Sequence, residues 1–213
     1  MFPEMSSFCP LCLKEVAHTL EPCPTCSDEL DKARCLLPLR QTQFGDWVMF
    51  AFHYVDLTRN LMLNFKYRKA FYLSRFFAQE LWKNIHSNFP WQKSVIVPVP
   101  SSIQKILKRK YQPVELLAQS LHSYSGLPLC SKLLYKNFSL QDQGQKGLRT
   151  QERIKNPSLS FTAKAPLFFP FQPASVLLLD DVFTTGSTLH ACKKAINKTF
   201  PGLPVYLAAV AHG

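Results

Sequence analysis

The 213 residues, 46% of them hydrophobic and 18% charged, can bury the core of one main domain beside a small appendage, which argues against a disordered chain. The formal net charge of +11 favours phosphate-rich partners, either nucleic acid or a polyphosphorylated small molecule. No window approaches the roughly 18 apolar residues of a membrane span and the N-terminus lacks a secretory signal, so we expect a cytoplasmic protein without membrane insertion.

The N-terminal segment carries two Cys-x-x-Cys pairs separated by ten residues. It has too few large apolar residues to fold on a hydrophobic core, whereas two such pairs complete a tetrahedral four-sulfur site whose metal-binding energy is also folding energy. Redox-active dithiols are the alternative, but a redox Cys-Pro-x-Cys motif opens a helix in a βαβ unit, which surrounds neither pair. We therefore predict a structural zinc site formed by Cys9, Cys12, Cys23 and Cys26.

A domain boundary is predicted near residue 40, where "LPLRQTQFG" combines a proline, polar residues and a glycine. We expect a zinc-finger or zinc-ribbon module over residues 1–40 and the main domain over residues 41–213. The first part holds four Lys/Arg against six Asp/Glu, and the remainder holds 21 against eight. The basic excess therefore belongs to the main domain.

The main domain alternates strand-like and helix-like segments. "DWVMFAFHYV" suits one strand or a tight pair, "LTRNLMLNFKY" and Ala70–Asn84 have helical character, and "SVIVPVP" is typical of a buried strand that ends in a constrained turn. A helix around Val114–Leu121 follows, then a possible strand at "SKLLY" and a long polar loop, "QDQGQKGLRTQERIKNPS". With a strand over Val176–Asp180, a helix over Leu189–Lys198 and a last strand "VYLAAVA", the pattern predicts an α/β domain around a mostly parallel sheet.

The stretch "VLLLDDVFTTGSTL" places two acids and several hydroxyls after a buried strand, where parallel sheets bind ligands. Asp180 and Asp181 repel each other there, so a ligand with several hydroxyls or a divalent cation favours the arrangement. Gly186 lets the backbone turn its N–H groups inward at the start of a helix, which suits a phosphate monoester. The alternative, an ordinary N-cap at Thr185 or Ser187, leaves the paired acids unexplained.

A basic stretch, "KILKRK", runs from Lys105 to Lys110, and further cations follow at Lys132, Lys136, Lys146 and Arg149 with tyrosines nearby. This mixture suits neutralisation of a single-stranded DNA backbone together with some base stacking. A solvated protein surface is the alternative. The candidates for DNA contacts are Lys105, Lys108, Arg109 and Lys110.

Several blocks of the chain resemble known families. "VLLLDDVFTTGST" resembles the 5-phosphoribosyl-1-pyrophosphate (PRPP) motif of type I phosphoribosyltransferases. Together with the four-cysteine finger, "NFKYRK", "VPVPSS" and the pattern Q-x-G-L-R-x-x-E-R-x-x-N from Gln145 to Asn156, it resembles the ComF family of competence-associated proteins. The family usually has Arg-Gly-Phe-Asn-Gln where this chain has Arg109-Lys110-Tyr111-Gln112-Pro113, so the role of that loop does not carry over.

The resemblance implies a Rossmann-like phosphoribosyltransferase core of about five strands, zinc in the finger, and magnesium accompanying PRPP. In this arrangement Asp180 and Asp181 contact the ribose hydroxyls, while Lys66 and "VPVPSS" lie on the pyrophosphate side. Arg153 and Asn156 belong to a loop that orders over the site. The 5-phosphate is held by the segment Thr184, Thr185, Gly186, Ser187 and Thr188.

Three hypotheses follow for the function. The first is action in natural transformation, in which the protein handles incoming single-stranded DNA in the cytoplasm with a helicase-like competence partner. The second is an active phosphoribosyltransferase that uses PRPP and magnesium, although the residues identify neither an acceptor nor a general acid or base. In the third, the pocket binds PRPP or a related phosphosugar as a sensor or as a grip on DNA ends.

Overall fold

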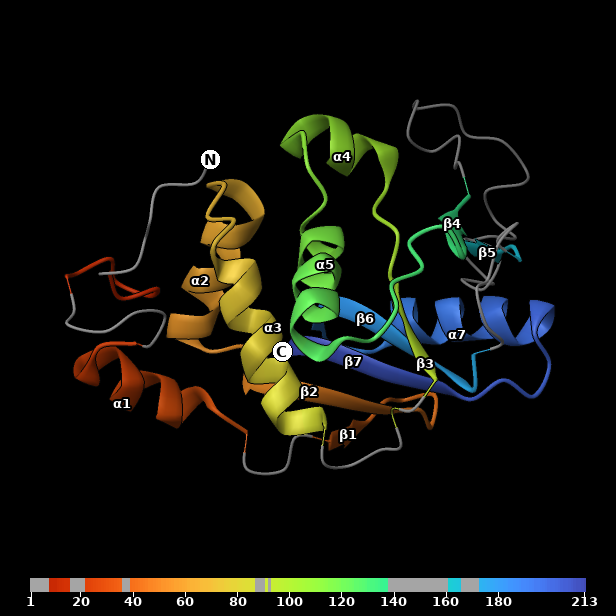
Figure 1. Ribbon diagram of the computed structural model, residues 1–213, viewed down its shortest axis with the longest axis horizontal. Helices are drawn as coiled ribbons and strands as arrows, with labels where there is room; N and C mark the ends of the chain where they lie inside the picture. The colour runs from red at the N-terminus through yellow and green to blue at the C-terminus, as the bar shows by residue number, and fades with distance from the viewer. Residues whose placement is uncertain are drawn as a thin grey trace.

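The computed structural model describes residues 8–15, 22–35, 39–86, 91, 93–137, 161–165 and 173–213. Its centre is a five-stranded sheet in the order β1-β2-β7-β6-β3 (Figure 1). The strands β2, β7, β6 and β3 are parallel, and β1 pairs with β2 in the antiparallel sense at one edge. The predicted α/β class and the mostly parallel sheet are therefore confirmed. The strand bounds are β1 Leu39–Gln41, β2 Trp47–His53, β3 Ser94–Pro98, β6 Ser175–Phe183 and β7 Val205–His212.

The inner strands read as continuous apolar runs because helices cover both faces of the sheet. The strand predicted over Val176–Asp180 is longer in the structure and continues to Phe183. Its pairing with β3 ends at Pro98↔Leu179, whereas its pairing with β7 continues as far as Phe183↔His212. The two consecutive acids thus lie on a part of β6 that β3 no longer flanks.

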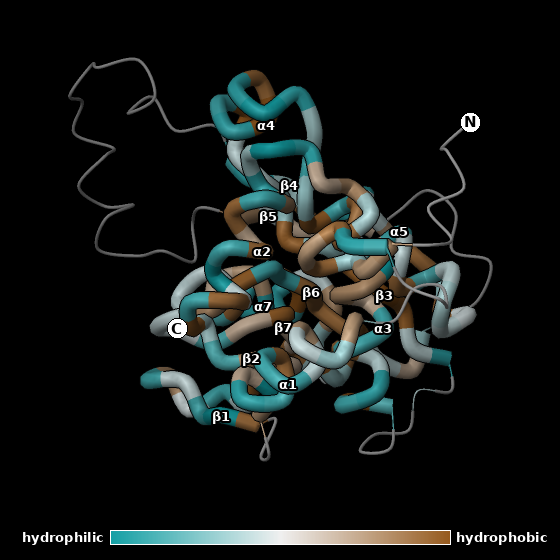
Figure 2. Tube along the Cα trace, turned by 90° about the vertical axis from the view of Figure 1, so that its left-hand side faces the viewer, coloured by the Kyte–Doolittle hydropathy of each residue, from teal (hydrophilic) through white to brown (hydrophobic). Residues whose placement is uncertain are grey.

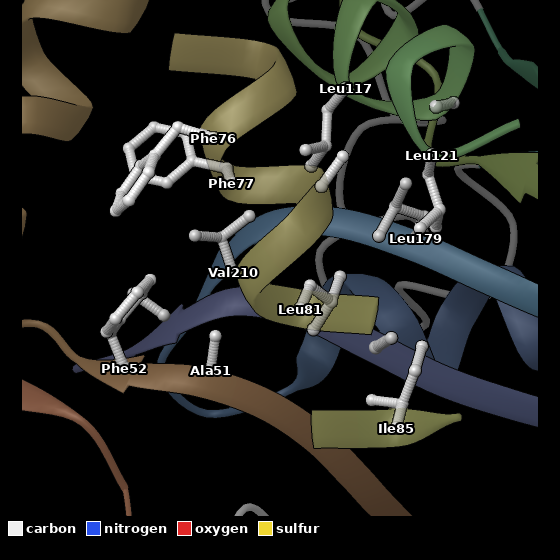
Figure 3. Close-up of a cluster of buried hydrophobic side chains, with 14 of the residues drawn as sticks. Ala51, Phe52, Phe76, Phe77, Leu81, Ile85, Leu117, Leu121, Leu179 and Val210 are labelled. Atoms are coloured by element: carbon white, nitrogen blue, oxygen red, sulfur yellow. The ribbon is translucent and has the colours of Figure 1, made fainter. Parts of the chain in front are cut away.

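One face of the sheet carries α2 (Asp56–Tyr67), α3 (Leu73–Ile85) and α5 (Pro113–Ser125). Each helix turns an apolar side to the sheet, as the helical spacing of the sequence predicts. Figure 3 shows Leu81 and Ile85 of α3 and Leu117 of α5 gathered over Leu179 and Val210 of the strands, all of them fully buried. Leu61 and Phe65 of α2 belong to the same buried cluster, which positions α2, and with it Lys66, relative to β6.

The opposite face carries α7 (Ser187–Thr199) and a short antiparallel ribbon formed by β4 (Leu134–Lys136) and β5 (Phe161–Ala163). The ribbon packs on α7 in Figure 1. α4 (Ile103–Arg109) stands apart from both and buries none of its residues. In Figure 2 the hydrophobic part of the trace is concentrated around β6 and β3, and a further hydrophobic segment lies within α4.

The N-terminal segment continues into the helix α1 (Pro24–Ala33), which packs on α2. Leu30 and Ala33 are buried in the same core as α2 and α3. Arg34 donates to the Glu80 carboxylate from Nε and Nη2, at 3.0 and 2.7 Å, which ties the end of α1 to α3. Among the described residues, no helix has both the length and the apolar character needed to cross a bilayer.

Candidate functional site

A hollow lies where β6 passes into α7, at the carboxyl edge of the parallel strands. Its cavity volume is about 50 Å³, enough for a few water molecules or a similarly small anion, since one water needs about 10–15 Å³. The structure thus brings Asp180 together with the whole predicted threonine-serine segment. The lining residues are Asp180, Val182, Phe183, Thr184, Thr185, Gly186, Ser187, Thr188 and Leu189.

The turn at Gly186 has a steric reason to be glycine. Gly186 caps α7 with a φ of +77°, in the left-handed region. A Cβ atom there would lie 2.3 Å from Thr42 Cγ2 and 2.9 Å from Thr42 Cβ. Both the backbone angle and the close approach of Thr42 therefore require glycine, and the turn is held in one shape by the segment that packs against it.

That supporting segment is the hairpin loop over residues 42–46, between β1 and β2. The Thr42 hydroxyl accepts hydrogen bonds from the N–H groups of Phe44 and Asp46, both at 3.2 Å. The Asp46 carboxylate contacts His190 Nδ1 at 2.5 Å and Lys193 Nζ at 2.8 Å. Phe44 also stacks on the His190 ring with centroids 4.3 Å apart. The loop is thereby fastened to the first two turns of α7, beside the hollow.

The two acids of β6 occupy different surroundings. Asp180 lines the hollow, and its carboxylate accepts the Asp181 N–H at 2.8 Å. Burial, and then the neighbouring charge of Asp181, raise the pKa of Asp180 to about 7, although Lys66 and Lys105 act in the opposite direction. Asp180 is therefore a half-buried carboxyl that changes protonation near neutral pH.

Asp181 is not among the residues that line the hollow and instead pairs with a lysine from another element. Lys66, near the end of α2, places Nζ 2.8 Å from Asp181 Oδ1, and both side chains are mostly buried. The Asp181 carboxylate also accepts the Val182 N–H at 2.7 Å. The sequence-predicted residues Lys66 and Asp181 thus meet, on a pair of elements separated by more than 100 residues of chain.

The proposed DNA-contact residues lie on α4 and its C-terminal cap. Arg109 places its guanidinium carbon 4.7 Å from the centre of the Tyr67 ring and donates from Nη2 to the Tyr67 hydroxyl at 3.0 Å. Lys110 caps the helix with a φ of +60°. Lys110 occupies the position where the family pattern has glycine. Its left-handed backbone conformation is one that glycine adopts without steric cost, so this chain departs from the pattern at a position that suits glycine. Ile103 and Leu107 of α4 are exposed.

Arg153 and Asn156, the predicted residues of a loop over the site, lie outside the described residues, as do Lys146 and Arg149. Of "VPVPSS", Ser102 caps the N-terminus of α4, where its hydroxyl accepts the Lys105 N–H at 3.4 Å. β3 therefore leads directly from the carboxyl edge of the sheet into the basic helix.

The four N-terminal cysteines converge. Their sulfur atoms all lie within 4.8 Å of one another, and the Cys12 and Cys23 sulfurs are 3.7 Å apart. A tetrahedral zinc site with Zn–S bonds of about 2.3 Å requires neighbouring sulfurs to be about 3.8 Å apart, so the spacing fits structural zinc. No disulfide joins these cysteines in the described residues.

The electrostatics of the cysteine cluster also favour a cation. Burial opposes ionisation of Cys9, but backbone N–H groups of Cys12, Cys23 and Leu11 outweigh it and lower the pKa of the Cys9 thiol to about 6. Burial and the neighbouring sulfurs raise the pKa of the Cys26 thiol. Four thiolates at this distance repel one another unless a metal ion neutralises them, and Cys23 and Cys26 begin α1, where the helix dipole favours anions.

Thr42, Asp46 and His190 were missed in the sequence, although they shape the site. No local signal marks them, because Asp46 and His190 are 144 residues apart and Thr42 looks like an ordinary turn residue. Asp46 and His190 meet because the sheet order places the β1–β2 loop next to α7.

No protein-family model matches the chain. It is similar to Competence protein F of Haemophilus influenzae, with 28% identity over 203 residues that cover 91% of this chain and 85% of the relative. It is also similar to Competence protein ComFC of Bacillus subtilis, with 24% identity over 189 residues that cover 88% of this chain and 70% of the relative. With the cysteine cluster and the acid-and-hydroxyl turn, these matches support the resemblance to the ComF family of competence proteins.

Proposed function

We propose that the protein acts in natural transformation, where it handles incoming single-stranded DNA in the cytoplasm with a helicase-like partner, and that its pocket binds PRPP or a related phosphosugar. The names of the two relatives support the competence role. The pocket proposal depends above all on one observation: Asp180 and the hydroxyl-bearing turn around Gly186 face the same hollow at the N-terminus of α7.

This hollow offers complementary groups to the two ends of a ribose phosphate. Backbone N–H groups at the start of a 13-residue helix, together with the hydroxyls of Thr184, Thr185 and Ser187, are donors for a phosphate dianion. Asp180 supplies acceptors for sugar hydroxyls at the other end. Magnesium would neutralise a bound pyrophosphate, and ligation by a cation or hydroxyls would offset the burial that raises the pKa of Asp180.

Lys66 and Asp181 form the second charged element of the proposed site. Asp181 holds the Lys66 ammonium group at the carboxyl edge of β6, where it is mostly buried. We expect Lys66 to face the pyrophosphate side of PRPP. We expect Asp181 to accept a hydrogen bond from a ribose hydroxyl that Lys66 also contacts. Arg153 and Asn156 complete this proposal as residues of a loop over the ligand.

The basic helix α4 supports direct contact with DNA. Its cations Lys105 and Lys108 are exposed on an element that buries none of its residues, so they can meet a phosphate backbone, while Arg109 is half-buried and bonded to Tyr67. Fluorescence anisotropy with labelled single-stranded DNA at several salt concentrations tests this role. We expect binding that weakens steeply with salt, and a smaller salt slope for Lys105→Gln with Lys108→Gln. Absence of binding by the wild-type protein at low salt would contradict the proposal.

A second candidate function, phosphoribosyl transfer, is favoured by the ionisation of Asp180. A carboxyl whose pKa is about 7 can accept or release a proton at neutral pH. In such a reaction an acceptor would form a bond to C1 of the ribose as the bond to pyrophosphate breaks. Following pyrophosphate release with PRPP, magnesium and a panel of acceptors tests it. Release that requires an acceptor and is lost in Asp180→Asn would support an enzyme, and silence across the panel would count against one.

A further inference from the structure

The ribbon β4–β5 and the adjacent side of α7 form a strongly basic surface that the function proposed above does not use. The described segments 131–137, 161–165 and 187–199 contain six lysines and no aspartate or glutamate. Five of these lysines are exposed. Together with one exposed tyrosine they make up what we call the ribbon surface: Lys132, Tyr135, Lys136, Lys164, Lys194 and Lys198.

The alternation of the ribbon decides which of its side chains point away from α7; Lys136, two residues after Leu134, is not one of them and places Nζ 5.5 Å from the centre of the Phe161 ring. Leu134 pairs with Ala163, and both are buried against α7. Their neighbours Tyr135 and Thr162, which pair with each other, therefore face the other way. Lys164, two residues after Thr162, lies on this same outer side and places Nζ 5.4 Å from the centre of the Tyr135 ring. Tyr135 remains 42% exposed, so its ring is accessible to another flat ring and has a cation beside it.

The lysines of α7 extend this surface along the helix. Ala191 and Ala195 are buried in the cluster that contains Phe161 and Ala163 of the ribbon. Lys194 and Lys198 follow these alanines by three residues each, so they lie on the neighbouring side of the helix. The Thr199 hydroxyl donates to the Ala163 carbonyl at 3.2 Å, which fixes the last turn of α7 to β5.

Acids from packed elements reach this region at its margins. Asp46 pairs with Lys193, the sixth lysine, which we therefore leave out of the surface. Glu115 of α5 accepts a hydrogen bond from Ser131, before β4 begins. Burial, and then the charge of Asp180, raise the pKa of the Cys192 thiol, and the charge of Lys136 opposes them.

We propose that the ribbon surface is a second contact site for single-stranded nucleic acid, separate from α4, with Tyr135 stacking on a base and Lys164, Lys194 and Lys198 meeting phosphates. This inference rests on the proposed DNA-handling function and names a path for the strand. Clustered cations alone fit any polyanion, but an exposed aromatic ring among them fits a strand with unpaired bases. Figure 1 shows the ribbon and α4 as separate elements, so a bound strand would meet two sites.

Anisotropy titrations of single-stranded DNA with paired variants test the cations. Lys164→Gln with Lys198→Gln should lower the salt slope by about 1.4, since each phosphate contact to a single strand contributes about 0.7. The control is Lys32→Gln with Lys93→Gln, which removes the same charge from exposed positions on α1 and before β3. If both pairs change the slope equally, the ribbon surface is not a contact site.

The stacking role is tested at Tyr135. Tyr135→Ala should weaken binding about fivefold or more, whereas Tyr135→Phe should bind as the wild type does, because the ring is retained. Tyr124→Ala, at an exposed tyrosine on α5, is the control and should have no effect. Photo-crosslinking with a 5-iodouracil oligonucleotide should attach the strand to Tyr135, as read by mass spectrometry of the peptides.

The outcomes separate this inference from the function on which it rests. Wild-type protein that binds no single-stranded DNA would overturn both. Binding that depends on α4 and is unaffected by every ribbon variant would overturn the ribbon surface alone. Equal binding of polyglutamate, dependent on Lys164 and Lys198 but unchanged in Tyr135→Ala, would show a site for acidic chains and contradict the assignment to nucleic acid.

Discussion

The four-cysteine cluster and the hollow beside α7 are both arranged for a ligand, but different forces hold them. The cluster brings four cysteine sulfur atoms within 4.8 Å of one another, and one of the four residues, Cys12, is exposed. The turn at Gly186 instead packs against Thr42 and is flanked in the chain by the buried residues Phe183 and Leu189. We therefore expect the first site to need a bound metal to be stable, whereas the shape of the second is set by contacts within the protein.

The largest expected effect is loss of the metal from the cluster. Cys12→Ser, or treatment with a strong chelator, should reduce bound zinc from one ion per chain to almost none, because four thiolates supply the binding energy. Hydrogen exchange should then increase over residues 8–15 and 22–26, while β6 and β7 stay protected. Zinc is measured by mass spectrometry of the intact protein and by elemental analysis.

Cys35→Ser is the control, because Cys35 is not part of the cluster. Collapse of protection across the whole sheet on chelation would contradict the contrast between the two sites. It would mean that the metal also holds the main core together.

The next effect tests how the turn is built. Gly186→Ala forces both a left-handed alanine and a contact of 2.3 Å with Thr42. We therefore expect a loss of about 2–5 kcal/mol in unfolding free energy, of which roughly 1–2 comes from the backbone and 1–3 from overpacking. Gly202→Ala has a similar φ of +81° with nothing within 4 Å, so it isolates the backbone cost. Chemical denaturation measures both variants.

Thr42→Ser should partly rescue Gly186→Ala, because it removes the Cγ2 atom and keeps the hydroxyl that Phe44 and Asp46 use. Equal losses in Gly186→Ala and Gly202→Ala would show that the hairpin does not shape the turn.

A smaller effect concerns pH. The pKa of Asp180 in the folded protein is about 7, above the roughly 3.9 of an unfolded aspartate. The folded state therefore binds the proton more tightly, and this group's contribution to stability falls as the pH rises from about 4 to 7. Asp180→Asn should be about 1–2 kcal/mol more stable than the wild type at pH 8 and equal to it near pH 4, allowing for the partial exposure of the carboxyl. A difference independent of pH would contradict the raised pKa.

The smallest effect is expected at Lys110. Lys110→Gly relieves a left-handed φ of +60° and should stabilise the protein by about 0.5–1 kcal/mol. Lys108→Gly removes the same charge from inside α4 and should destabilise the helix by a similar amount. Thermal unfolding distinguishes the two, and stabilisation by both would point to charge repulsion instead of backbone strain.

The sequence predicted the long buried strands and the helices with clear apolar spacing, because a regular spacing of apolar residues can be recognised within one short segment of the chain. It missed β1, α4 and β5, which are three to seven residues long and have little or no buried periodic pattern. α1 was missed because the cysteine spacing dominated that segment. "SKLLY" does contain a strand, but only its last part and the following lysine form β4.

The candidate site was predictable as a list of residues but not as an arrangement. Asp180 and the turn from Thr184 to Thr188 lie within nine consecutive residues of the sequence, so they were found together. The separation of the two acids was not foreseen, because it depends on the Lys66 contact from α2. The support from Asp46 and His190 likewise arises from strand order, which no local pattern contains.

Calorimetry of PRPP binding in the presence of magnesium tests the central claim, that the hollow at the end of β6 is a phosphosugar site. The wild-type protein should bind PRPP, Asp180→Asn should bind at least about tenfold more weakly, and Asp28→Asn, on the exposed side of α1, should match the wild type. Ribose 5-phosphate should compete for the same site. No heat of binding with the wild type, or equal affinity in Asp180→Asn, would contradict the claim.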